Sequence, residues 1–122
     1  MPNSYRKDHH NFFRTASFVP QTGTDDVSIN WAAGNKYHLA LDNDSTVTFA
    51  TNPMNPCNLV LKVKQGNGGN NTITWVVDTG DLYWLDNTEP NLTDDDDFTD
   101  IITFYFDGTD YFGVPSFNFD TS

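Results

Sequence analysis

Apolar residues in this chain recur at every second position in short runs, and turn-forming residues separate one run from the next. Residues 27–31, 37–41, 59–63 and 73–77 all show this alternation. Because successive side chains of a strand point to opposite faces, a period of two predicts strands that bury one face. The same pattern would spread apolar residues all around a helix, so it constrains the chain to an all-β fold.

The C-terminal third adds the clearest turn in the sequence. Residues 101–106 are apolar or hydroxylic throughout, which predicts burial on both faces. Asp107-Gly108 then predicts a tight turn into a strand at 111–114, and 65–71 (QGNGGNN) reads as a loose hairpin loop. With the remaining runs, the sequence predicts a jelly-roll-like β-sandwich of about seven or eight short antiparallel strands.

A cluster of breakers at 20–23 (PQTG) predicts a boundary between residues 1–20, an N-terminal arm, and residues 21–122, the sandwich domain. Residues 1–19 carry three basic side chains and one acid, a net charge of +2, whereas the rest carries three lysines and 16 acids, a net charge of −13. A basic, aromatic segment on an acidic body is typical of a docking arm, either helical or extended. Its candidate contact residues are Tyr5, Arg6, Lys7, Phe12, Phe13, Arg14 and Phe18.

The sequence offers little for catalysis or for cofactor binding. His9 and His10 lie in the arm, His38 is expected on the exposed face of its strand, and the lone Cys57 is expected to be a half-buried apolar residue. No phosphate-binding glycine loop or activated nucleophile is recognisable. We therefore expect no enzyme activity and no cofactor, with a hydrolase that uses paired loop carboxylates as the minor alternative.

The acidic body is expected to repel nucleic acid, and no apolar run is long enough to span a bilayer. Among the aromatic residues, Trp31 and Trp75 are in register with apolar neighbours and are expected in the core. Tyr83 and Trp84 border an acidic loop and are the candidates for an exposed platform or a subunit contact.

The segment from about Val27 to Phe119 resembles a β-domain of tailed-bacteriophage virion proteins, found in small head-surface proteins and in tail fibres. The matching pieces are W..GN (31–35), TFATNP (48–53), LVLKVKQGNGG (59–69), TITW (72–75), Trp84, P.LT (90–93) and D..TFYFDGTDYFGV..FNF (100–119). The family pattern has proline after TITW, where this chain has Val76, and a neutral glycine-containing loop after the second tryptophan, where this chain has DNTE. Those departures leave the fold expectation intact and bear on binding specificity in the loops.

The resemblance implies a jelly-roll-like domain, often trimeric, with a structural or adhesive role. The short arm favours a head decoration or cement protein on the outer surface of the virion, with the major capsid protein and neighbouring subunits as partners. The alternative is a tail-tip or tail-fibre module that binds a host receptor or glycan. In a homotrimer, Asp94–Asp97 of three chains could meet near the axis and bind a cation.

Overall fold

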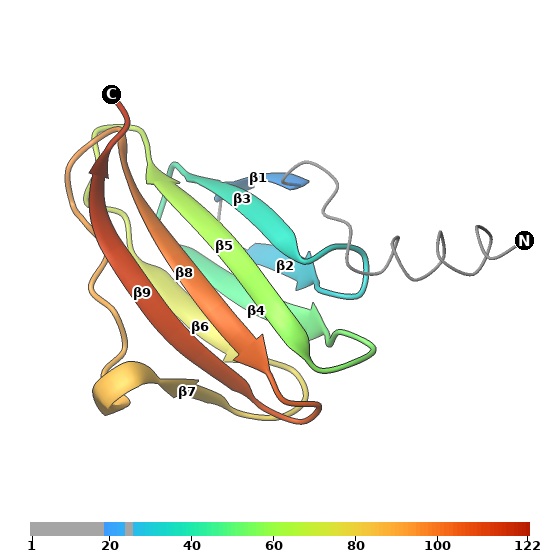
Figure 1. Cartoon of the computed structure of the whole chain (residues 1–122). Helices are drawn as coiled ribbons and strands as arrows, with labels where there is room; N and C mark the ends of the chain where they lie inside the picture. The colour runs from blue at the N-terminus through green and yellow to red at the C-terminus, as the bar shows by residue number, and fades with distance from the viewer. Residues whose placement is uncertain (1–18, 24–25) are drawn as a thin grey trace, which may run out of the picture.

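The computed structural model describes residues 19–23 and 26–122. In this part of the chain, nine strands form two sheets that pack face to face (Figure 1). The large sheet has the order β1-β3-β5-β8-β9-β7 and the small sheet the order β2-β4-β6. The strands are β1 (Val19–Gly23), β2 (Asp26–Asn30), β3 (Lys36–Leu41), β4 (Ser45–Thr51), β5 (Cys57–Gln65), β6 (Ile73–Val77), β7 (Leu82–Trp84), β8 (Phe98–Phe106) and β9 (Tyr111–Asp120), and a 3-10 turn, η1 (Leu85–Asn87), follows β7. The prediction of an all-β sandwich is confirmed.

The direction of the strands differs from the prediction. Over the first six strands the chain alternates between the sheets, so each turn crosses the core instead of returning to a hydrogen-bonded neighbour. The four ladders among these strands are consequently parallel. The β7–β9 ladder is also parallel. The predicted antiparallel pairing is wrong for these strands, and the loop at 65–71 joins two sheets and forms no hairpin. Turn residues show that a chain reverses, but they do not show which sheet it enters.

Two ladders are antiparallel, β5–β8 and β8–β9. The second is a hairpin, which the Asp107-Gly108 signal predicted. The Asp107 carboxylate accepts hydrogen bonds from the backbone N–H groups of Thr109 (2.9 Å) and Asp110 (2.7 Å), and these bonds hold its pKa below the usual range. The hairpin lies between β5 and β7 in the large sheet (Figure 1). Its β8 buries one face only, since Thr103 and Tyr105 are exposed, so the predicted burial on both faces is wrong.

The first strand was missed by the sequence analysis. Its residues Pro20 and Gly23 were interpreted as breakers, yet β1 pairs in parallel with β3. Proline is tolerated at the edge of a sheet, where one side of the strand needs no ladder hydrogen bond. The first sandwich strand therefore begins at Val19, inside the segment assigned to the arm.

The core between the sheets is rich in aromatic residues, with Phe49 at its centre. The Phe49 ring centroid lies 5.5 Å from that of Trp31, 5.2 Å from Phe104 and 4.9 Å from Tyr111. Trp31 is buried, as predicted, whereas Trp75 is only half-buried. The tilted and edge-on geometries are those that aromatic pairs prefer. The other buried apolar residues are Val27, Ile29, Tyr37, Leu39, Leu41, Val47, Leu59, Leu61, Val63, Ile73, Ile102 and Phe106.

Two polar loops far apart in the sequence, 65–71 and 94–97, pack against each other. The Asn70 N–H donates to the Asp94 carbonyl (2.8 Å), and the Asp97 N–H donates to the carbonyl of Gln65 (3.0 Å). A Cβ at Gly69 would lie 2.1 Å from the Asp94 carbonyl oxygen, so only glycine permits this approach. We call this contact the loop junction.

One buried carboxylate fixes the connection between these loops and the last strand. Asp100 is 2 % exposed and accepts hydrogen bonds from the N–H (2.7 Å) and hydroxyl (2.7 Å) of Thr93, and from the N–H of Asn118 (3.0 Å). Asn118 lies where β9 shifts its register against β8. The bond from Asp100 therefore satisfies a backbone donor that the bulge removes from the ladder.

Candidate functional site

The predicted arm contacts lie outside the described residues. These contacts are Tyr5, Arg6, Lys7, Phe12, Phe13, Arg14 and Phe18.

The predicted contact pair Tyr83 and Trp84 divides between two faces of β7. Tyr83 is 49 % exposed and stacks on Phe112, with ring centroids 5.4 Å apart. Trp84 points the other way, where its ring lies 5.2 Å from Trp75 and 5.7 Å from Phe104. Successive side chains of a strand point to opposite faces, so the two residues cannot form one platform. Tyr83 remains a surface residue, and Trp84 closes the edge of the core.

Tyr83 belongs to an exposed apolar surface on the outer side of the large sheet. The strand register brings its members together from β7, β8 and β9, which lie side by side (Figure 1). Between 41 % and 49 % of each of their side chains is exposed. The register shift at Asn118 turns Phe119 to this side. The exposed members are Tyr83, Tyr105, Phe112, Val114 and Phe119.

The same face carries the lysines of the sandwich. Lys36 on β3 and Lys62 and Lys64 on β5 occupy outward positions, since the alternate residues of both strands are buried. They are the only lysine or arginine side chains in the part of the chain whose side chains are described. Apart from the exposed Asp120 at the end of β9, no acidic residue occupies an outward position of β3, β5, β7, β8 or β9. We call this surface the aromatic–lysine face.

Charges around this face shift two of its ionisable groups. Burial and the positive charges of Lys62 and Lys64 lower the pKa of His38. The negative charges of Asp81 and Asp110, at the strand ends, raise the pKa of the Tyr83 hydroxyl. The face therefore carries positive charge along β3 and β5, and Asp81 and Asp110 place negative charge beside it, just before β7 and β9 begin.

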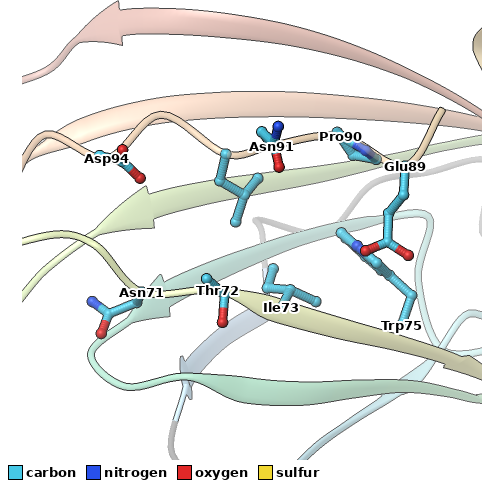
Figure 2. Close-up of a pocket in the computed structure, with 9 residues that line it drawn as sticks. Asn71, Thr72, Ile73, Trp75, Glu89, Pro90, Asn91 and Asp94 are labelled. Atoms are coloured by element: carbon cyan, nitrogen blue, oxygen red, sulfur yellow. The ribbon is translucent and has the colours of Figure 1, made fainter.

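A cleft of about 380 Å³ lies at the free edge of the small sheet, between β6 and residues 89–94 (Figure 2). One wall is formed by Asn71, Thr72, Ile73 and Trp75, and the other by residues 89–92 and Asp94. Figure 2 shows the side chain of Glu89 extending toward Trp75, with Asp94 opposite Asn71 at the other end. The loop junction joins Asn70 to Asp94 and closes that end. We call this site the edge cleft.

The described residues form no recognisable catalytic or metal centre. No group of three or more His, Cys, Asp or Glu side chains in this part of the chain could hold a metal ion. The thiol of Cys57 is half-buried, as expected, and burial raises its pKa, which makes it a poorer nucleophile. A cation site shared by Asp94–Asp97 of three chains stays a prediction. No helix within the described ranges is long and apolar enough to span a membrane.

Neither the aromatic–lysine face nor the edge cleft was predicted from the sequence. The lysines and the exposed aromatic residues are visible in the sequence, but their common face follows from the order of the strands. The cleft has a weaker signal: Glu89 is the only glutamate of the chain. Its proximity to Trp75 depends on how residues 85–94 run past the small sheet, which local patterns do not specify.

No protein-family model matches this chain, and comparison with curated proteins and with solved structures finds no match either.

Proposed function

We propose that this chain is a structural protein of a bacteriophage virion, a decoration or cement protein that attaches to the outer surface of the head and stabilises it. The observation that carries the proposal is the aromatic–lysine face. It combines five exposed apolar side chains with three lysines on a body whose loops are acidic. Contiguous exposed apolar surface marks an interaction site. The resemblance of the sequence to virion β-domains favours a capsid as the partner.

The chemistry of this face indicates how it would bind a shell. Tyr83, Tyr105 and Phe112 present aromatic rings, the side chains that most often dominate binding energy at interfaces. Lys62 and Lys64 would meet carboxylates of the major capsid protein and guide association, because complementary charge mainly sets specificity and association rate. The acidic loops would remain in solvent and keep neighbouring copies apart except where the shell holds them.

The N-terminal arm would supply a second attachment point, to the shell or to a neighbouring subunit. Its net charge of +2 is opposite to that of the body. In a homotrimer, three modest contacts of this kind would combine into tight attachment through high effective concentration. The role proposed here is binding and involves no catalysis.

Binding of purified protein to phage heads that lack it tests the proposal. The double variant Tyr105→Ser, Phe112→Ser should bind at least about tenfold more weakly, because truncating an aromatic residue that is a hot spot of an interface costs about 2 kcal/mol or more. Met54→Ser removes a side chain that is 77 % exposed but lies in a loop outside the face, so it serves as the control. Unchanged binding by the double variant would rule out this docking face.

Deletion of residues 1–18 tests the arm separately, since it leaves every described strand in place. We expect binding to heads to be lost while the far-ultraviolet circular dichroism spectrum stays that of a β protein. Undiminished binding by the shortened chain would reject the arm as an attachment point.

The edge cleft favours one second candidate, a tail-tip or tail-fibre module that recognises a host receptor. Small-molecule sites are typically concave and combine apolar walls with a few convergent polar groups, as this cleft does. The number of copies per virion separates the two candidates, because a decoration protein is abundant and a tail-tip protein is not.

A further inference from the structure

The geometry points to a binding site for a neutral oligosaccharide in the edge cleft, between β6 and residues 89–94 (Figure 2). This inference goes beyond the proposed attachment to heads. It depends only on the cleft, so it holds or fails independently of where the chain lies on the virion.

The wall of the cleft that residues 89–94 form presents polar side chains that have no polar partner among the described residues. The side chains of Glu89, Asn91 and Asp94 line the cleft, and none of them makes a hydrogen bond or ion pair with the described residues. A carboxylate accepts hydrogen bonds on both oxygens, and an amide both donates and accepts. Sugar hydroxyls, which also do both, match this set, and their bonds to carboxylates are strengthened by charge.

The opposite wall adds main-chain groups. The Ser45 N–H donates to the Thr72 carbonyl and the Asp78 N–H donates to the Phe49 carbonyl. Together with the register of the parallel β4–β6 ladder, these bonds show that the N–H and C=O groups of the even-numbered residues of β6 point toward β4. The N–H and C=O groups of Ile73 and Trp75 therefore face the free edge, where the cleft lies. Each of these residues offers one donor and one acceptor to a ligand.

The cleft also has an apolar component suited to the C–H face of a sugar ring. Trp75 is half-buried and lies at the Glu89 end of the cleft (Figure 2), and Ile73 and Leu92 add aliphatic surface to its lining. The indole of Trp75 is held in place by edge contacts with Trp84 (5.2 Å) and Phe49 (6.2 Å). A rigid aromatic wall loses little conformational entropy when a ligand packs on it.

The charge of the cleft and the short stretch of β6 inside it indicate which class of ligand it binds. Glu89 and Asp94 give the cleft two carboxylates and no lysine or arginine lines it, so sialylated or sulfated sugars would be repelled. An extended peptide is less well matched, because only two residues of β6 present main-chain groups inside the cleft. Strand addition draws its affinity from a longer run of such bonds.

The site stays accessible when the aromatic–lysine face is occupied. That face is the outer side of the large sheet, whereas the cleft lies at the β6 edge of the small sheet (Figure 1). A docked copy could therefore bind a glycan at the same time.

Full-length protein applied to an array of neutral oligosaccharides, with sialylated and sulfated counterparts, tests the inference. We expect binding to one or more neutral oligosaccharides, and weaker or no binding to their acidic counterparts. Titration calorimetry with the strongest neutral binder should then show affinity reduced about tenfold or more by Glu89→Gln, which replaces a charged acceptor with a neutral amide, and by Asn91→Ala, which removes an amide that bonds the ligand. Asp78→Asn is the matched control, since it removes an exposed carboxylate just beyond β6 and outside the cleft.

Backbone amide shifts of the wild-type protein provide a readout that does not depend on variants. Adding the neutral binder should move the amide signals of Ile73 and Trp75 and leave those of Phe112 and Val114 in place. Three results would overturn the inference: no binding to any neutral oligosaccharide at millimolar concentration, a preference for acidic sugars, or wild-type affinity in both cleft variants.

Discussion

At the scale of single residues, this fold depends on a few polar groups buried among many apolar ones. Asp100 is the clearest case, because its carboxylate holds Thr93 in the polar connection and Asn118 in the last strand. Buried charge is costly unless several donors surround it, and here three do. Asp100 opens the D..TFYFDGTDYFGV..FNF piece, but no local pattern predicted that this one of 17 acidic residues would be buried.

Replacing Asp100 with alanine should lower the free energy of unfolding by about 3 kcal/mol. The change would leave the N–H groups of Thr93 and Asn118 buried without acceptors, and each such loss costs roughly 1–3 kcal/mol. Urea unfolding followed by tryptophan fluorescence measures the effect. Asp78→Ala, at an exposed acid, should change stability by less than about 0.5 kcal/mol. Equal effects of the two substitutions would contradict the role given to Asp100.

His38 should make the protein less stable in mild acid. Burial beside Lys62 and Lys64 holds its pKa below the unfolded value of about 6.5, so protonation favours the unfolded chain. Its contribution is complete above pH ~6.5 and is lost as pH falls below that value. His38→Gln should therefore lose less stability than wild type between about pH 7.5 and 5 in urea unfolding. Parallel losses in the two proteins would show that His38 is not the group responsible.

At the scale of elements, the sequence predicted where strands lie far better than how they pair. The alternation of apolar and polar residues is a local property, so the positions of the strands from β2 onward could be predicted from their own residues. Pairing is non-local: the β8–β9 hairpin was predictable because Asp107-Gly108 joins its strands directly. The parallel ladders were not, because the partner of β3 is β5, with β4 intervening in the other sheet. Tyr83 was identified as a surface candidate from its neighbours, whereas its partner Phe112 required the register.

The loop junction gives a prediction with an internal control, because two adjacent glycines both have positive φ. Gly68 and Gly69 have φ of 91° and 82°, yet only a Cβ at Gly69 would collide with backbone, at the Asp94 carbonyl. Gly68→Ala should cost about 1 kcal/mol from backbone strain alone. Gly69→Ala should cost about 3 kcal/mol or more, because the 94–97 loop must also move.

Thermal unfolding of both variants distinguishes strain from collision. The larger fall in Tm is expected for Gly69→Ala, and that variant should also disturb the amide signals of residues 94–97. Matching falls in Tm would mean that the two loops are not held together as described.

At the scale of the whole molecule, the two sheets separate two surfaces of different chemistry. The outer side of the large sheet is apolar and carries all the lysines of the described sandwich. The edge of the small sheet holds a polar, acidic cleft. Composition predicted an acidic body but not this division, since it arises when distant strands lie side by side. We propose the first surface for attachment to a partner protein and the second for binding a ligand.

We propose that this protein decorates phage heads. The most direct test is its copy number in purified virions relative to the major capsid protein, measured by quantitative mass spectrometry with isotope-labelled peptides. Decoration of the head requires a ratio near parity or a simple fraction that fits the shell lattice. A handful of copies per particle, or none, would contradict placement on the head.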